Sequence, residues 1–106
     1  MFEWALLIGS TRNNEKRFRD AEKIVTEKGF IVFTPVFYDY EEYKLFGDYP
    51  NMLDKMCYQK FCMSDILVLV TPEHIGHRTS VRIQQAKECH KKIFIIEGTK
   101  LKEFTD

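Results

Sequence analysis

Four short apolar segments, separated by polar and helix-forming stretches, constrain the fold of this chain more than any other feature. They lie at residues 5–8, 30–34, 66–70 and 92–97, and the clearest is the unbroken run from Ile66 to Val70. Continuous apolar runs of this length are typical of strands that are buried on both faces of a sheet. We therefore predict four strands at these positions.

The stretches between these strands carry helical signals. A helix is predicted for residues 14–28, because Asn13 and Asn14 can cap its first turn and Lys28-Gly29 is typical of a helix end. Two further predicted helices cover residues 50–61 and 79–90. No period holds through the aromatic residues 37–49, so a long loop is predicted there, and long loops in compact domains are often functional.

Strands that alternate with helices favour parallel pairing through right-handed crossovers. We predict a single α/β domain over residues 1–106, with a small, doubly wound, mostly parallel sheet of four or five strands and helices on both faces. Strand order 2-1-3-4 places a switch point between the first and third strands. Ligands of such sheets bind beyond the carboxyl ends of those strands. Residues 98–106 are polar and carry no predicted element.

Composition excludes several classes of protein. Lys+Arg and Asp+Glu number 16 each in 106 residues, whereas a domain that holds a nucleic-acid polymer carries a basic excess. No apolar run approaches the ~20 residues that span a bilayer, and residues 1–8 lack the pattern of a signal peptide. Three cysteines, an odd number, fit a reducing compartment. We therefore expect a cytoplasmic protein without a nucleic-acid or membrane partner.

Gly9, Ser10, Thr11 and Arg12 form the first of two segments at the predicted switch point. Glycine permits close backbone approach, the two hydroxyls donate hydrogen bonds, and the guanidinium can pair with a phosphate or a carboxylate. The further glycines of a dinucleotide fingerprint and the Gly-Lys-Ser/Thr ending of a P-loop are both missing. The segment is a candidate anion-binding turn, with a plain turn and polar helix cap as the alternative.

Gly76, His77, Arg78 and Thr79 form the second segment, and Arg82 follows one helical turn after Arg78. Free amides at the start of the predicted helix should point into the crevice. Cations in a first helical turn oppose the helix dipole by roughly 0.3–1 kcal/mol each, and an anionic ligand would reverse that penalty. Either both arginines bind such a ligand or both project into solvent.

Other reactive side chains near the crevice predict no metal site and no cofactor. His74 and His77 are three residues apart but have no third ligand at suitable spacing. The carboxylates on this side are Asp39, Asp54, Asp65 and Glu73, and Asp54 lies on a helix that can border the crevice. Cysteine and methionine side chains of the same helix are predicted to pack in the core: Cys57, Cys62, Met52, Met56 and Met63.

Four segments resemble, in the right order, motifs of the nucleoside 2-deoxyribosyltransferase-like superfamily, which includes nucleotide N-glycosidases. Residues 7–12, L-I-G-S-T-R, resemble the first loop, which typically reads Gly-Ser followed shortly by Arg. Residues 60–65, K-F-C-M-S-D, resemble the K-I-x-x-(A/S)-D approach to the third strand. Residues 74–86, H-I-G-H-R-T-S-V-R-I-Q-Q-A, resemble the segment Y-I-G-E-S-T-x-x-E-I-x-x-A, and residues 91–96 resemble the G-K-x-I start of the fourth strand.

The resemblance implies a chemistry that this chain alters at one position. In the family, a glutamate in the helix after the third strand attacks the anomeric carbon of a (deoxy)ribonucleoside; the base leaves, and another base or water takes the sugar. That glutamate aligns with Arg82, whose protonated guanidinium has no lone pair to offer. No acidic residue occurs from residue 74 to 87. The resemblance also implies assembly, since family members usually complete each other's sites.

Three functions follow from these observations. The first is binding of a nucleotide or a related phosphorylated sugar without glycosyl transfer, with base stacking on Phe37, Tyr38 or Tyr40. The second is an active deoxyribosyltransferase or nucleotide N-glycosidase that uses Asp54 or Asp39 as nucleophile. The third is a non-enzymatic interaction protein that uses the loop at residues 37–49. Six aromatic rings in these 13 residues are difficult to cover in one small monomer, so we expect a homodimer or larger assembly.

Overall fold

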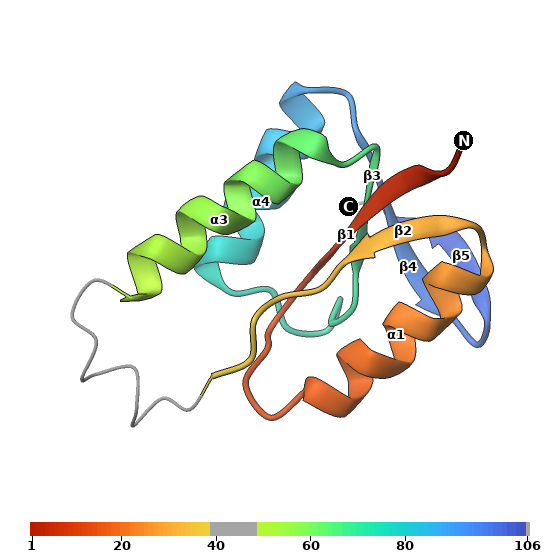
Figure 1. Cartoon of the computed structure of the whole chain (residues 1–106), viewed down its shortest axis with the longest axis horizontal. Helices are drawn as coiled ribbons and strands as arrows, with labels where there is room; N and C mark the ends of the chain where they lie inside the picture. Colours follow the sequence, from red (N-terminus) through yellow and green to blue (C-terminus); the bar gives the residue numbers. More distant parts are fainter. Residues whose placement is uncertain (39–48, 106) are drawn as a thin grey trace.

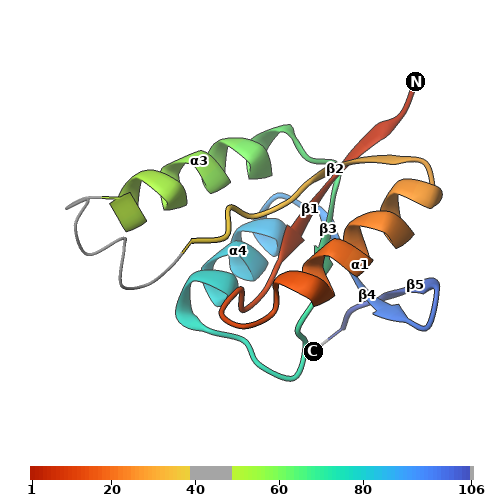
Figure 2. The ribbon, with the colours of Figure 1, turned by 60° about the horizontal axis from the view of Figure 1, so that its bottom comes forward.

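A computed structural model describes residues 1–38 and 49–105 of the chain. In chain order its elements are β1 (Glu3–Ile8), α1 (Glu15–Glu27), β2 (Phe30–Phe33), α3 (Tyr49–Met63), β3 (Ile66–Leu69), α4 (His77–Glu88), β4 (Lys92–Glu97) and β5 (Lys100–Glu103). A single sheet lies between α1 on one face and the pair α3 and α4 on the other (Figures 1 and 2). Within the described residues, no helix is both long enough and apolar enough to cross a membrane.

The strand order is β2-β1-β3-β4-β5, so the predicted order 2-1-3-4 is confirmed and a fifth strand is added at its end. The first four strands pair in parallel, while β5 pairs antiparallel with β4. No element was predicted for this tail, because only Leu101 of its four strand residues is apolar. Gly98, at φ +63°, permits the tight turn that returns the chain along the sheet edge.

The two faces of the sheet explain why the strand sequences are apolar without alternation. Successive side chains of a strand point to opposite faces. Leu7 and Val68 therefore pack toward α1, whereas Leu6 and Leu67 pack with Phe61 of α3 and Ile83 of α4. Each fully buried side chain of this size contributes about 1.5–3 kcal/mol to folding. Both helical layers are thus held by the same two central strands.

The helix ends differ in detail from the prediction. Asn14 stands at the N-cap position of α1, but its side chain donates to the carbonyl oxygen of Ser10 (2.9 Å) instead of capping the helix. The other end of α1 is as predicted, with Lys28 as C-cap residue and Gly29 at φ +96°. α4 begins at His77, before the predicted residue 79, because Gly76 takes the N-cap position.

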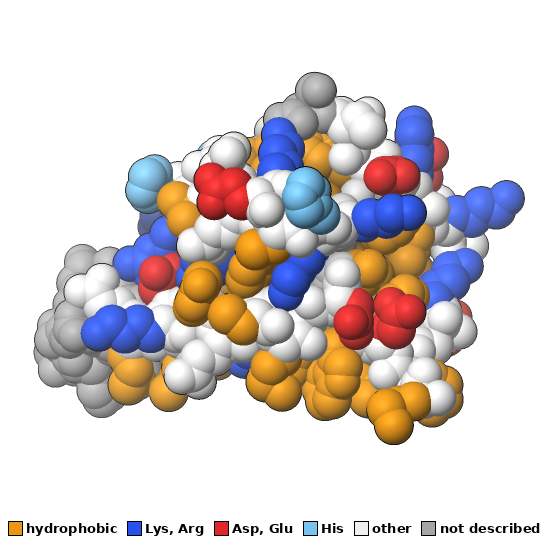
Figure 3. All heavy atoms as spheres, turned by 90° about the horizontal axis from the view of Figure 1, so that it is seen from above, with side chains coloured by type: hydrophobic (Ala, Val, Ile, Leu, Met, Phe, Trp, Pro, Cys, Tyr) orange, Lys and Arg blue, Asp and Glu red, His pale blue; other side chains and the backbone are white. Residues whose placement is uncertain are grey.

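α3 buries fewer of its apolar side chains than predicted. Met52, Met56 and Met63 are exposed, and so is Cys62, so their predicted place in the core is wrong. The reason is that α3 carries apolar residues all around its surface, while one side alone faces the sheet, with Phe61 fully buried and Cys57 half-buried. Figure 3 views the molecule from the top of Figure 1 and shows hydrophobic side chains exposed among lysines and arginines.

Gly9 ends β1 with φ +143°, a conformation that side chains rarely permit. A β-carbon there would lie 2.7 Å from Oγ1 of Thr71 and 3.2 Å from its backbone nitrogen. The Thr71 hydroxyl accepts a hydrogen bond from the Ser10 amide (2.8 Å) and donates to the carbonyl of His74 (3.1 Å). This close approach joins the loops that follow β1 and β3.

We predict that Gly9→Ala lowers the free energy of unfolding by about 2–4 kcal/mol, because backbone strain adds to the overlap with Thr71. Gly98→Ala is the matched control: its φ is also positive, but nothing lies within 4 Å of the new β-carbon. Its cost should be only about 1–2 kcal/mol. Urea unfolding of both variants measures the difference, and equal losses would show that the contact with Thr71 has no energetic role.

Candidate functional site

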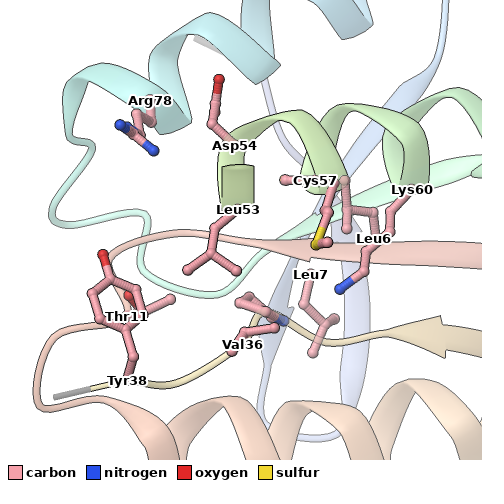
Figure 4. Close-up of a pocket in the computed structure, with 12 residues that line it drawn as sticks. Leu6, Leu7, Thr11, Val36, Tyr38, Leu53, Asp54, Cys57, Lys60 and Arg78 are labelled. Atoms are coloured by element: carbon pink, nitrogen blue, oxygen red, sulfur yellow. The ribbon is translucent and has the colours of Figure 1, made fainter. Parts of the chain in front are cut away.

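Two adjacent hollows open at the carboxyl end of β1, the switch point of the sheet. The larger has a volume of about 140 Å³ and the smaller about 80 Å³. They lie between β1, the chain that follows β2, α3 and the start of α4 (Figure 4). The residues that line both are Leu7, Pro35, Asp54, Cys57 and Arg78. They are therefore two parts of one concave site.

The larger hollow combines an apolar interior with polar groups at its two ends. Leu53 of α3 lies in the middle of the view in Figure 4. Arg78, Tyr38 and Thr11 lie to one side of it, and Lys60 lies to the other side, beside Cys57. A ligand that fits this arrangement has an apolar body and a polar group at each end.

The smaller hollow is lined by Gly9, Thr79 and Arg82, among others. Arg82 is 5% exposed, so burial of its charge requires partners. Nη2 of Arg82 donates to Oδ1 of Asp54 (2.9 Å) and to its carbonyl oxygen (2.8 Å), and Nη1 donates to Oε1 of Gln85 (2.9 Å). Nε of Arg82 is buried and has no acceptor among the described residues.

Through its bonds to Asp54, Arg82 of α4 holds α3 in place. The guanidinium holds the amino-terminal half of α3 through Asp54 and lies over the ring of Tyr58, 5.6 Å from its centroid. At the other end of α3, Nζ of Lys91 donates to the carbonyl oxygens of Phe61 (2.6 Å) and Ser64 (2.8 Å). Because α3 forms one wall of the larger hollow, the shape of that hollow depends on both cations.

The first turn of α4 offers the backbone amides that anions bind. Its N-cap residue is Gly76, which has no side chain to occupy these amides. No acidic residue lies in this turn, whereas His77 and Arg78 are both there and both exposed. The amino end of a helix carries a partial positive charge. The start of α4, with Arg78 beside it, is therefore suited to a phosphate or a carboxylate.

An ion pair holds the loop before α4 against α1. The Arg17 guanidinium donates to both carboxylate oxygens of Glu73. These bonds lower the pKa of Glu73 below its ordinary value, because they favour the ionised carboxylate. Both side chains are about half exposed, so the pair positions the loop more than it stabilises the fold.

The structure brings together part of the predicted site. Seven predicted residues line the two hollows: Gly9, Thr11, Tyr38, Asp54, Arg78, Thr79 and Arg82. Ser10 and Arg12 belong to the loop after β1, and Gly76 and His77 to the start of α4, but these four residues do not line either hollow. Phe37 instead packs edge-on against Phe18 of α1, with the guanidinium of Arg19 over its ring. Asp39 and Tyr40 lie outside the described residues, as does most of the aromatic segment 37–49.

The wall that α3 and the residues after β2 contribute was not predicted from the sequence. Leu53, Lys60, Pro35 and Val36 line the larger hollow and were not predicted as site residues. One signal was present, since Lys60 opens the segment that resembles the family's approach to the third strand. Within the part of the chain that is described, no three histidine, cysteine or acidic side chains are grouped to hold a metal ion.

We predict that Arg82→Met lowers the free energy of unfolding by about 2–3 kcal/mol, because Asp54 and Gln85 lose their partner. The Asp54 side chain is 43% exposed, so water can take over part of its solvation. Arg82→Glu should cost more, since two carboxylates would then face each other, and the exchanged pair Asp54→Arg with Arg82→Glu should recover part of that loss. Urea unfolding measures all three. If Arg82→Met left the free energy of unfolding unchanged, Arg82 would not hold α3 in place.

Comparisons of the chain with models of protein families, with curated proteins and with solved structures give no match. What the structure shows is an α/β fold with a five-stranded, mostly parallel sheet of order β2-β1-β3-β4-β5. The function is therefore inferred from the residues of the two hollows and from the motifs that the sequence carries.

Proposed function

We propose that the chain is a member of the nucleoside 2-deoxyribosyltransferase-like superfamily that binds a nucleotide or a related phosphorylated sugar and does not transfer the sugar. One observation carries this proposal: a hollow at the switch point of a parallel sheet has an apolar interior and Arg78 at the start of a helix on its rim. Open α/β sheets bind their ligands at this place. A cytoplasmic location is part of the proposal, in keeping with three free cysteines.

The phosphate in this proposal binds at the start of α4. Backbone amides of the first turn and the Arg78 guanidinium supply donors and positive charge. The Thr79 side chain lies within the same turn, and Thr11 approaches from the loop after β1. A neutral nucleoside would leave this end without its anion, so the proposal favours a phosphorylated ligand.

The base in this proposal occupies the larger hollow. An apolar cavity of about 150 Å³ holds a ring of the size of benzene, and the hollow of about 140 Å³ is comparable. Leu53, Val36 and Leu7 provide apolar contacts for the faces of a ring, and Tyr38 lies at the rim. A pyrimidine base or the six-membered ring of a purine therefore fits inside, while the sugar and phosphate extend toward Arg78.

Absence of glycosyl transfer is supported by the surroundings of Arg82. The position that aligns with the family's nucleophilic glutamate holds a buried cation with Asp54 as its partner. A cation at this place also repels the positive charge that develops on the sugar as the base departs. Loss of such stabilisation costs tenfold in rate for each ~1.4 kcal/mol.

A second candidate function, glycosyl transfer with Asp54 as nucleophile, is favoured by one observation. Asp54 lines both hollows, and its carboxylate is half-buried at their junction. Its Oδ1 already accepts a hydrogen bond from Arg82, which lowers its readiness to attack a carbon atom. The first function therefore explains the geometry better.

The proposed binding predicts that nucleoside monophosphates raise the melting temperature more than the matching nucleosides do. At ten times Kd, binding to the folded state adds about 1.4 kcal/mol, or roughly 6–11 °C for a domain of this size. Arg78→Met should abolish the shift. Lys23→Met is the matched control, because Lys23 is an exposed cation on α1 that lines neither hollow.

The same preparations decide between binding and catalysis. We expect no release of base from labelled nucleosides or nucleotides by the unmodified protein. Turnover that survives Arg82→Ala but disappears in Asp54→Asn would establish the second function instead. No thermal shift with any phosphorylated or free nucleoside would reject both functions and leave a non-enzymatic interaction role.

We also propose that copies of the chain assemble into a homodimer or larger oligomer. The segment first expected to mediate assembly, residues 37–49, lies largely outside the described residues. Exposed apolar side chains on α3 add support: Met52, Met56, Tyr58 and Met63. Light scattering at high protein concentration should give at least twice the monomer mass of 12.7 kDa. A monomeric mass would contradict this part of the proposal.

A further inference from the structure

Lys60 brings a second cation to the larger hollow, away from the end where Arg78 lies. It belongs to the last turn of α3, is half-buried and lies beside Cys57. Figure 4 shows Lys60 and Arg78 on opposite sides of Leu53. The two cations are therefore placed to contact different parts of one ligand and not the same phosphate.

The ammonium of Lys60 has donors to offer to such a ligand. An ammonium carries three N–H donors and no acceptor. Within the described residues, its one acceptor is the carbonyl oxygen of Thr34, at 3.2 Å. The remaining donors of the half-buried ammonium face the hollow, so a ligand that supplies an acceptor there gains a hydrogen bond to a charged group.

The surroundings of Lys60 favour a neutral acceptor. Leu6, Val36 and Cys57 line the hollow near it and offer no charged donors. A phosphate needs several donors at once, and those are found at the start of α4. A carbonyl oxygen on the edge of a flat ring needs only one or two hydrogen-bond donors. The polar groups of the two ends thus match a nucleotide whose base points toward Lys60.

Nucleobases differ in what they present to an ammonium. Guanine has the adjacent acceptors O6 and N7, which lysine binds, whereas adenine has an amino donor in place of O6. Uracil and thymine carry the acceptor O4, whereas cytosine carries an amino donor at that position. When the ammonium faces an amino group, both groups are donors, and neither gains a hydrogen bond from the other.

We propose that Lys60 is a specificity-determining residue that selects nucleotides whose base carries a carbonyl oxygen at the O6 position of a purine or the O4 position of a pyrimidine, namely guanine, hypoxanthine, uracil and thymine, over those of adenine and cytosine, which do not. This inference rests on the proposed function, because it concerns the base end of the same hollow. A well-placed contact of this kind discriminates between bases by roughly 5- to 100-fold in affinity.

The test measures dissociation constants by calorimetry for two matched pairs, GMP against AMP and UMP against CMP. The unmodified protein should bind GMP and UMP roughly 5- to 100-fold more tightly than their partners. Lys60→Met should remove both preferences while AMP and CMP affinities stay within about twofold. Lys55→Met, an exposed position on the same helix that does not line the hollow, should keep them.

Lys60→Gln is the second variant, because glutamine both donates and accepts and so should bind either base of a pair equally well. If Lys60 has a purely structural role and only ties α3 to Thr34, both variants should lose stability and keep the base preference. Nucleotide binding without base preference would overturn the inference and leave the proposed function standing. Equal weakening of all four nucleotides by Lys60→Met would assign Lys60 to the phosphate instead. No binding of any nucleotide would reject the proposed function together with the inference.

Discussion

The parallel pairing of β1 with β3 is the constraint on which the rest of the structure depends. Both strands are buried on both faces, with Leu6, Leu7, Leu67 and Val68 each at most 1% exposed. Because the chain leaves β1 toward one face and β3 toward the other, their carboxyl ends separate into two loops. The Thr71 hydroxyl then joins these loops through the Ser10 amide. The hollows form where the central strands of the core end.

Arg82 shows how a buried charge can set the shape of a site. A buried guanidinium requires acceptors, and Asp54 and Gln85 provide them. The bond to Asp54 fixes α3 against α4, and α3 forms one wall of the larger hollow. A glutamate at position 82 would place two carboxylates together and release that wall. The buried charge at position 82 and the shape of the larger hollow are therefore physically linked.

The sequence predicts the fold well for a physical reason. Apolar runs such as residues 66–70 are stable only when both faces are covered, which requires helices on each side and hence parallel crossovers. β5 lacks such a run and is defined by its pairing with β4, so periodicity cannot reveal it. Gly9 and Arg78 could be predicted to lie at the crevice, because the end of β1 and the start of α4 are visible in the sequence. The side of α3 that faces the hollow could not be predicted, because apolar residues surround that helix. Only tertiary contact distinguishes Leu53 and Lys60 from Met52 and Met63.

Cationic side chains lie at both ends of the larger hollow although the net charge of the molecule is zero. Arg78 and Lys60 line its two ends, whereas Arg82 lines the smaller hollow and pairs with Asp54. An ion placed at one end gains little from the other, because the Coulomb energy falls with distance and the solvent screens it. In the proposed function, the start of α4 binds an anion, and Lys60 binds a neutral acceptor held between apolar walls. The ligand of that proposal is elongated, flat at one end and charged at the other, which is the form of a nucleotide.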